Sequence, residues 1–200
     1  AGVEGAFRFL KRLWRQVYLH VEAGLPQAEL DKTALNDEQK ALRRQLHQAL
    51  QKVSDDMARR HTFNTAIAAN MELVNALNKF EDDSVNGSAV RQEALEAIVL
   101  MLSPIIPHAA QQLWKELGHG DDIVLAAWPG VDESALVQEA IEMVVQVNGK
   151  LRGKLSVAAS ATKEQIEALA LVDENVLRYI EGKPVKKLIV VPRKLVNIVV

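Results

Sequence analysis

Apolar residues recur every three or four positions through the first 118 residues, and this spacing predicts a series of amphipathic helices. The first helix is expected from Val3 to about Gly24, with an apolar stripe at Val3, Phe7, Leu10, Trp14, Val17 and Val21. Further helices are expected over residues 36–60, 62–80 and 88–117. Asn36 and Gln39 suit a capping box, Ser88 is expected to cap the fourth helix, and Pro104 and Pro107 interrupt it. Short connections between such helices predict an antiparallel bundle over residues 1–118.

The pattern changes after Gly118. Residues 119–139 combine Gly and Pro with acidic residues, and we expect a linker with few packed contacts there. Residues 140–200 alternate short apolar runs with turn signals, and Thr162 and Gln165 suit a second capping box. Two continuous apolar runs, 185–191 and 195–200, predict covered strands. The expected fold is therefore multi-domain, α and α+β: a helix bundle followed by a small α+β domain with a basic β-hairpin.

The hairpin is predicted at Asn148-Gly149, because this dipeptide between apolar runs is a strong turn signal. A two-residue loop would pair Val147 with Lys150 and would place the basic residues on the apolar face. A three-residue loop ending in a left-handed Gly149 shifts the register by one residue. We favour the three-residue loop, because it places Lys150, Arg152 and Lys154 together on the solvent face and Leu151 with Met143, Val145, Leu155 and Val157 on the other.

Charge is distributed unevenly along the chain. Residues 1–137 hold 14 Lys+Arg and 19 Asp+Glu, whereas residues 138–200 hold 10 and 7. A basic region attached to an acidic body suggests an anion-binding partner. The candidate nucleic-acid contacts in the second domain are Lys150, Arg152, Lys154, Lys186, Lys187, Arg193 and Lys194. The first helix adds Arg8, Arg12 and Arg15 on one face, for which a solvated surface is the simpler interpretation.

Several classes of function are disfavoured by the residues present. The chain has no cysteine, so disulfides and thiolate metal sites are excluded. Its five histidines lack metal-ligand spacing, and no Ser lies in a nucleophile-elbow motif. No apolar run before residue 188 could span a bilayer, and no signal peptide is present, so we expect a soluble cytoplasmic protein. We also expect a monomer. Because Ala1 lies inside an expected helix, the chain is interpreted as part of a longer protein. Trp14 and Trp114 are expected in the core, and Trp128 is expected to pin the linker to the bundle.

Several motifs resemble those of one enzyme group. The segments that carry the resemblance are Gly5-Ala6 to Trp14, Phe63-Asn64-Thr65-Ala66, Leu102-Ser103-Pro104 to Trp114, and Trp128-Pro129. They resemble the anticodon-binding bundle of class I aminoacyl-tRNA synthetases of the leucyl, isoleucyl and valyl group. The segment Val145–Lys154 and the terminal run from Val190 resemble the C-terminal domain of bacterial leucyl-tRNA synthetases.

The resemblance implies a division of labour. This part would bind leucine-specific tRNA, and the catalytic and editing domains would precede Ala1. The piece itself would need no cofactor, whereas the parent enzyme would use ATP and Mg²⁺. Because leucine has six codons, the family is thought to recognise tRNA by its shape, at the elbow and the long variable arm. The C-terminal domain would contact the elbow.

Two other hypotheses compete with tRNA binding. The chain could be a helical adaptor for protein partners, with its basic tail solvated. It could also be a small enzyme, although no nucleophile–base pair or metal cluster supports that hypothesis. Binding to tRNA that weakens steeply with salt would favour the first interpretation over the adaptor.

Overall fold

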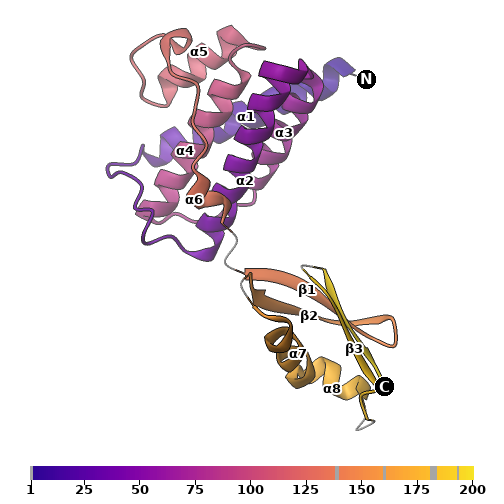
Figure 1. Ribbon diagram of the computed structural model, residues 1–200. Coiled ribbons are helices and arrows are strands. Elements are labelled where there is room, and N and C mark those ends of the chain that lie inside the picture. Colours follow the sequence, from indigo (N-terminus) through magenta and orange to yellow (C-terminus); the bar gives the residue numbers. More distant parts are fainter. Residues whose placement is uncertain (1, 138–139, 160, 181–183, 193) are drawn as a thin grey trace. The chain divides into compact units, whose positions relative to one another are not determined.

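The computed structural model describes residues 2–137, 140–159, 161–180, 184–192 and 194–200. The chain divides into two compact units, one ending at Leu136 and the other starting at Val137 (Figure 1). Unit 1 is a helix bundle, and unit 2 is a small α+β unit, so the predicted fold class is confirmed.

Unit 1 consists of five main helices and three short helical segments. The main helices are α1 Gly2–Ala23, α2 Asp37–Asp55, α3 Phe63–Leu77, α4 Val85–Leu102 and α5 Pro107–Glu116. The short segments are the π-helical turn η1 Asp56–Arg60, the 3₁₀ turn η2 Ile123–Leu125 and the four-residue helix α6 Glu133–Leu136. Pro107 occupies the first turn of α5, where a missing backbone N–H costs nothing, which explains why the fourth predicted helix is divided in two.

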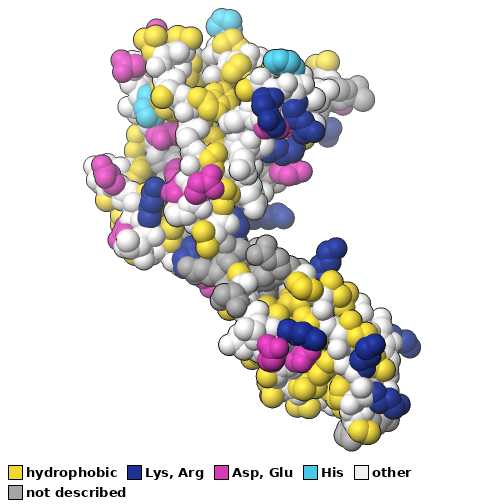
Figure 2. All heavy atoms as spheres, viewed as in Figure 1, with side chains coloured by type: hydrophobic (Ala, Val, Ile, Leu, Met, Phe, Trp, Pro, Cys, Tyr) yellow, Lys and Arg dark blue, Asp and Glu magenta, His cyan; other side chains and the backbone are white. Residues whose placement is uncertain are grey.

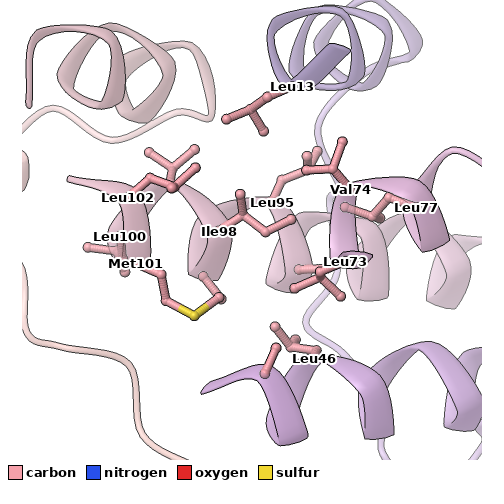
Figure 3. Close-up of a cluster of buried hydrophobic side chains, with 14 of the residues drawn as sticks. Leu13, Leu46, Leu73, Val74, Leu77, Leu95, Ile98, Leu100, Met101 and Leu102 are labelled. Carbon is pink, nitrogen blue, oxygen red and sulfur yellow. The ribbon is translucent and has the colours of Figure 1, made fainter. Parts of the chain in front are cut away.

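The core of unit 1 lies where α1, α2, α3 and α4 meet (Figure 3). Leu13, Leu46 and Leu73 extend toward the α4 side chains Leu95, Ile98 and Met101, and all six are almost fully buried. α4 is apolar around most of its circumference, because neighbouring helices cover it on several sides. It is the central helix of the bundle.

The helix starts follow the capping rules, with one correction. Asn36 and Gln39 form the predicted capping box of α2. The cap of α4 is Ser84, not Ser88: the Ser84 hydroxyl accepts a hydrogen bond from the Gly87 amide at 3.0 Å. Asn86 and Gly87, which precede the range expected for the fourth helix, therefore lie inside α4. A Cβ at Gly87 would lie 2.5 Å from the backbone oxygen of Asp82, so only glycine fits this close approach.

The predicted apolar stripe of α1 is only in part its core face. Val17 is buried and Leu10 and Val21 pack against the core, whereas Phe7 is 65% exposed and Trp14 is 40% exposed. The stripe also omitted Phe9 and Leu13, which are buried. The prediction failed because α1 carries apolar residues on two adjacent faces, and spacing alone does not say which face meets the bundle. Trp14 is thus largely outside the core, while Trp114 is buried as predicted and stacks on the His119 ring with centroids 3.5 Å apart.

The first part of the predicted linker belongs to unit 1. Residues 119–136 pack along the bundle, with Ile123 buried and the Trp128 indole donating a hydrogen bond to Ser54 Oγ at 2.8 Å. Trp128 therefore pins this segment as expected. The expectation of few packed contacts is wrong for 119–136, because Arg43 and His47 bind Asp132 across a sequence separation that local composition does not reveal. Residues 138 and 139 lie outside the described residues.

Unit 2 is a four-stranded mixed sheet with two helices on one face. The strands are β1 Ala140–Val147, β2 Lys150–Ala158, β3 Lys187–Val191 and β4 Leu195–Val199, in the order β2-β1-β4-β3. Among the described strand pairs, β1–β4 is parallel and the other two are antiparallel. Helices α7 Lys163–Val172 and α8 Glu174–Ile180 pack Ile166, Ala170 and Val176 against Met143, Val145 and Val196. Thr162 and Gln165 form the predicted capping box of α7.

The β1–β2 turn differs from the favoured prediction. Val147 pairs with Lys150 across a two-residue loop, in which Asn148 and Gly149 both have positive φ, 50° and 77°. The register then shifts between Val145 and Gln146, where Arg152 is the extra residue of a β-bulge. The bulge returns Met143, Val145, Leu155 and Val157 to the covered side, so that part of the expected face is confirmed. Leu151 does not join them and is 61% exposed.

Candidate nucleic-acid interface

The exposed cations of α1 form a continuous basic stripe. Arg8, Lys11, Arg12 and Arg15 are all exposed, and none of them pairs with an acidic residue in the described part of the chain. Together with Gly5 and Met71 of α3 they line an open hollow of about 490 Å³. Lys and Arg side chains also gather at one end of the bundle on the face drawn in Figure 2. This stripe has the charge and the free donors that a phosphate backbone requires.

The cations of η1, the turn that follows α2, are arranged differently. Arg59 pairs with Asp55, and Arg60 Nη1 lies 3.4 Å from Asp56 Oδ1. Asp56 is buried, and its pKa is lowered by hydrogen bonds from Thr65 and Thr62 and by the charges of Lys52 and Arg60. These arginines are therefore partly neutralised by their own helix, whereas the α1 stripe is free to bind an external anion.

The bulge in β2 separates the three hairpin cations that were expected to share one face. Lys154 lies opposite Val144 on the uncovered face, and its Nζ lies 2.9 Å from Glu142. Arg152 turns to the helix side and stacks on Tyr179 of α8, with its guanidinium carbon 3.9 Å from the ring centroid. Lys150, next to the turn, is exposed. The predicted common face is therefore wrong.

The sheet instead arranges the described candidate cations of unit 2 other than Arg152 in two groups, one at each end of the sheet. Lys150 lies at the turn end of the sheet, where Asn148 N donates to Ile198 O. The last residues of β4 also hold Lys186 and Lys187: Lys186 N donates to Val199 O, and Lys187 pairs with Val199. Three strand spacings separate Lys150 from Lys187, which is roughly 15 Å between backbones. We call Lys150, Lys186 and Lys187 the turn-end cations.

Lys154 and Lys194 lie toward the opposite end of the sheet. Val144 pairs with Lys154 on one side, and its amide donates to Lys194 O at 3.1 Å on the other. Arg193 lies outside the described residues. Sequence reasoning found these cations but could not group them, because the parallel β1–β4 pairing that brings them together joins segments about 50 residues apart.

A buried ion network in unit 1 was not anticipated. The Arg43 side chain is 2% exposed and donates to Glu93 Oε2 at 2.7 Å and to Asp132 Oδ2 at 3.0 Å. His47 Nδ1 accepts a hydrogen bond from the Asp132 amide, and Lys32 also pairs with Asp132. Hydrogen bonds from Lys32, Ser134 and Arg43 hold the pKa of Asp132 far below its usual value. This network is structural, since it uses its charges on one another.

Other kinds of site find no support in the described ranges. Within them, no group of three or more His, Asp or Glu side chains could hold a metal ion. No described helix is long and apolar enough to cross a membrane. Among the described residues, features with free binding capacity include the basic stripe of α1, the turn-end cations and an apolar hollow beside α1 that is described below.

Comparison with known proteins identifies the family to which this chain belongs. A family profile described as the anticodon-binding domain of tRNA ligase matches residues 39–168, from the start of α2 into α7. The chain is 61% identical over 199 residues to the leucine–tRNA ligase of Alcanivorax borkumensis and 62% identical over 200 residues to that of Thioalkalivibrio sulfidiphilus. Each match covers all of this chain but 24% of the relative, so the chain spans about a quarter of their length.

One similar solved structure is the ternary complex of Agrobacterium radiobacter K84 agnB2 LeuRS with tRNA and LeuAMS. It superposes with a TM-score of 0.74 and 28% sequence identity over 98% of this chain and 25% of that chain. The resemblance to leucyl-tRNA synthetases that the motifs predicted is therefore confirmed. The chain belongs to the family of anticodon-binding domains of tRNA ligases, and it is similar along its whole length to leucine–tRNA ligases.

Proposed function

We propose that this chain is the tRNA-binding, C-terminal part of a leucine–tRNA ligase. It would hold leucine-specific tRNA while a catalytic portion outside residues 1–200 attaches leucine. The observation that carries the proposal is the 61% identity to a leucine–tRNA ligase over the whole chain. The parent enzyme would use ATP with Mg²⁺ and would act as a cytoplasmic monomer.

Two basic surfaces support this function. The α1 stripe presents Arg8, Arg12 and Arg15 to solvent without acidic partners in the described residues. The turn-end cations do the same on unit 2. Lys154, Lys194 and Arg193 are secondary candidates, and Arg152 would act through Tyr179, on which it stacks. The hollow beside the α1 stripe is open, which suits recognition of backbone shape.

Shape recognition agrees with the chemistry of these surfaces. A-form RNA presents phosphates and 2′-hydroxyls but hides its base edges in a deep major groove, so proteins read folded RNA by its shape and by stacking on unpaired bases. We infer that unit 2 contacts the tRNA elbow, where unpaired loop bases meet, and that unit 1 lies along the body of the tRNA. The exposed Tyr179 ring beside Arg152 gives unit 2 a surface on which a base could stack.

The experiment is a salt titration of tRNA affinity. A fluorescent leucine tRNA transcript is titrated with the 200-residue chain at several salt concentrations, and a transcript for another amino acid serves as control. Binding through phosphates predicts a linear fall of log affinity with log salt. An affinity that does not change with salt would contradict the proposal. Footprinting of the bound tRNA that showed protection only in the anticodon loop would contradict it as well.

The second candidate is a protein adaptor, and one observation favours it. Phe7 and Tyr18 of α1 are more than half exposed, which is unusual for large aromatic side chains on a helix that is otherwise packed. An adaptor that binds only through this face would show no salt-dependent affinity for tRNA. The same titration therefore separates the two functions.

A further inference from the structure

The helix α1 has a second exposed face beside its basic stripe. Phe7, Trp14 and Tyr18 are 65%, 40% and 53% exposed. Their spacing of seven and four residues places them on one side of the helix. With Leu10 and Leu13 of α1 and Ala109 and Leu113 of α5 they line an open hollow of about 650 Å³. We call Phe7, Trp14 and Tyr18 the aromatic face of α1.

The aromatic face is not needed to hold α1 in the bundle. Phe9, Leu13 and Val17 already bury the adjacent face of the helix against the core. Three large rings left in water on one face carry a hydrophobic cost that is recovered only when another apolar surface covers them. A contiguous apolar patch with polar edges is typical of a docking surface. Here the edges are Lys11 and Arg15, which also line the hollow.

We propose that the aromatic face docks the bundle onto an apolar surface in the part of the parent ligase outside residues 1–200. This inference rests on the proposed function. The relatives are about four times longer than this chain, so most of the homologous polypeptide is available to cover the face. A second copy of the chain fits poorly, because two aromatic faces packed together would also bring their Lys11 and Arg15 rims together.

Docking through this face would give α1 two roles on adjacent sides. The basic stripe would hold RNA phosphates, while the aromatic face would fix the helix to the catalytic portion. Because both faces belong to one rigid 22-residue helix, tRNA bound to the stripe would be held in a defined position relative to the catalytic centre.

The test uses a whole-length protein. The matching 24% of the Thioalkalivibrio sulfidiphilus ligase is replaced by this chain, and Phe7→Gln with Tyr18→Gln is introduced into the chimera. Gln is a good helix former and leaves the charge unchanged, so neither helix propensity nor phosphate attraction is altered. The control is Val85→Gln with Val124→Gln, since both valines are exposed and neither lines the hollow.

In scanning calorimetry, we expect the bundle in the chimera to melt above the isolated 200-residue chain. The aromatic double variant should remove that difference, and the control should keep it. In the isolated chain the same variant should neither lower the melting temperature by more than about 2 °C nor change tRNA affinity or its salt slope. Aminoacylation by the chimera should fall at least tenfold in the aromatic variant alone.

Three results would overturn the inference. One is a chimera whose bundle melts no higher than the isolated chain. Another is loss of tRNA affinity in the isolated aromatic variant, which would mean that the face stacks RNA bases. The third is a wild-type chain that sediments as a dimer and a variant that sediments as a monomer, which would make a second copy the occupant. Absence of tRNA binding by the wild-type chain would instead contradict the proposed function.

If the chimera does not fold, the same comparison is made in trans. The ligase truncated to exclude the matched segment is titrated with the 200-residue chain in a calorimeter. Binding that the aromatic variant weakens at least tenfold, and that the control retains, supports the inference. Equal binding by wild type and variant contradicts it, and so does no binding to a truncated ligase that still activates leucine.

Discussion

The two units of this chain use their charges in opposite ways. In unit 1 the most buried cation, Arg43, is enclosed by Glu93, Asp132 and His47, and serves to hold residues 119–136 on the bundle. In unit 2 the described cations other than Arg152 lie at the surface, and the described ion pairs, such as Lys154 with Glu142, are solvent-exposed. The difference shows that a count of charges says little about binding. A cation is available to bind an external anion when it does not already pair with an acidic residue.

The two units also differ in the size of their cores. Unit 1 buries side chains from α1 to α5 around a central helix, whereas unit 2 has a small core under one face of its sheet. Small domains bury a lower fraction of their surface, so unit 2 has less free energy of folding to lose. All three tryptophans, Trp14, Trp114 and Trp128, lie in unit 1. Tryptophan fluorescence therefore reports the unfolding of unit 1 alone, which makes the comparison measurable.

The largest effect is expected from removing Arg43. Arg43→Met removes the buried cation that joins the partly buried Glu93 and Asp132, and breaking a buried pair from one side costs about 3–5 kcal/mol. Urea unfolding followed by tryptophan fluorescence should show this loss, and proteolysis within residues 119–136 should become faster. The matched control is Lys32→Ala, which removes an exposed partner of the same Asp132 and should cost under about 1 kcal/mol. Equal losses in the two variants would mean that the network does not hold the segment.

The next effect concerns tRNA affinity and compares the two groups of unit 2 cations. Changing the turn-end cations Lys150, Lys186 and Lys187 to Ala should weaken tRNA binding at least tenfold and flatten the salt slope by roughly 2–3 units. Lys154→Ala with Lys194→Ala should have a smaller effect, because Lys154 already pairs with Glu142. Amide exchange of unit 2 peptides should be unchanged in both. A larger loss in the second variant would place the contact at the other end of the sheet.

A smaller effect is the acid sensitivity of unit 1. Hydrogen bonds from Ser84, and then from Asn36 and Gln39, lower the pKa of Asp82 to about 2. Because this folded value lies below the unfolded one, the stabilisation is present above about pH 4 and is lost as the pH falls toward 2. Asp82→Asn should reduce stability at pH 6 and make its dependence on pH between 4 and 2 shallower, as read by tryptophan fluorescence in urea. Parallel pH curves for variant and wild type would contradict this role.

Much of unit 1 could be predicted from local sequence, and the predictions that failed have a physical cause. The Asn36–Gln39 box and the break at Pro107 are encoded within a few residues. The core face of α1 and the Arg43–Asp132 contact depend on what packs against them, and no local pattern records that. In unit 2, the Asn148-Gly149 turn was predictable, but the bulge at Arg152 was not. The bulge allows a two-residue turn and still places the apolar residues of β2 on the covered face. It depends on how the whole strand pairs, which a local pattern does not reveal.

The smallest expected effect concerns that bulge. Arg152 stacks on Tyr179, and its Nε is buried without a hydrogen-bond partner, so its position depends mainly on the ring. Exposed cation–π contacts contribute about 0.5–1 kcal/mol, and Tyr179→Leu should destabilise unit 2 by that amount. Hydrogen exchange of peptides from residues 150–158 should report it, while tryptophan fluorescence should show no change in unit 1. Tyr179→Phe keeps the ring and should keep the stability. Equal losses in the Leu and Phe variants would point to the hydroxyl, and the bulge would then owe its position to the turn and the buried face alone.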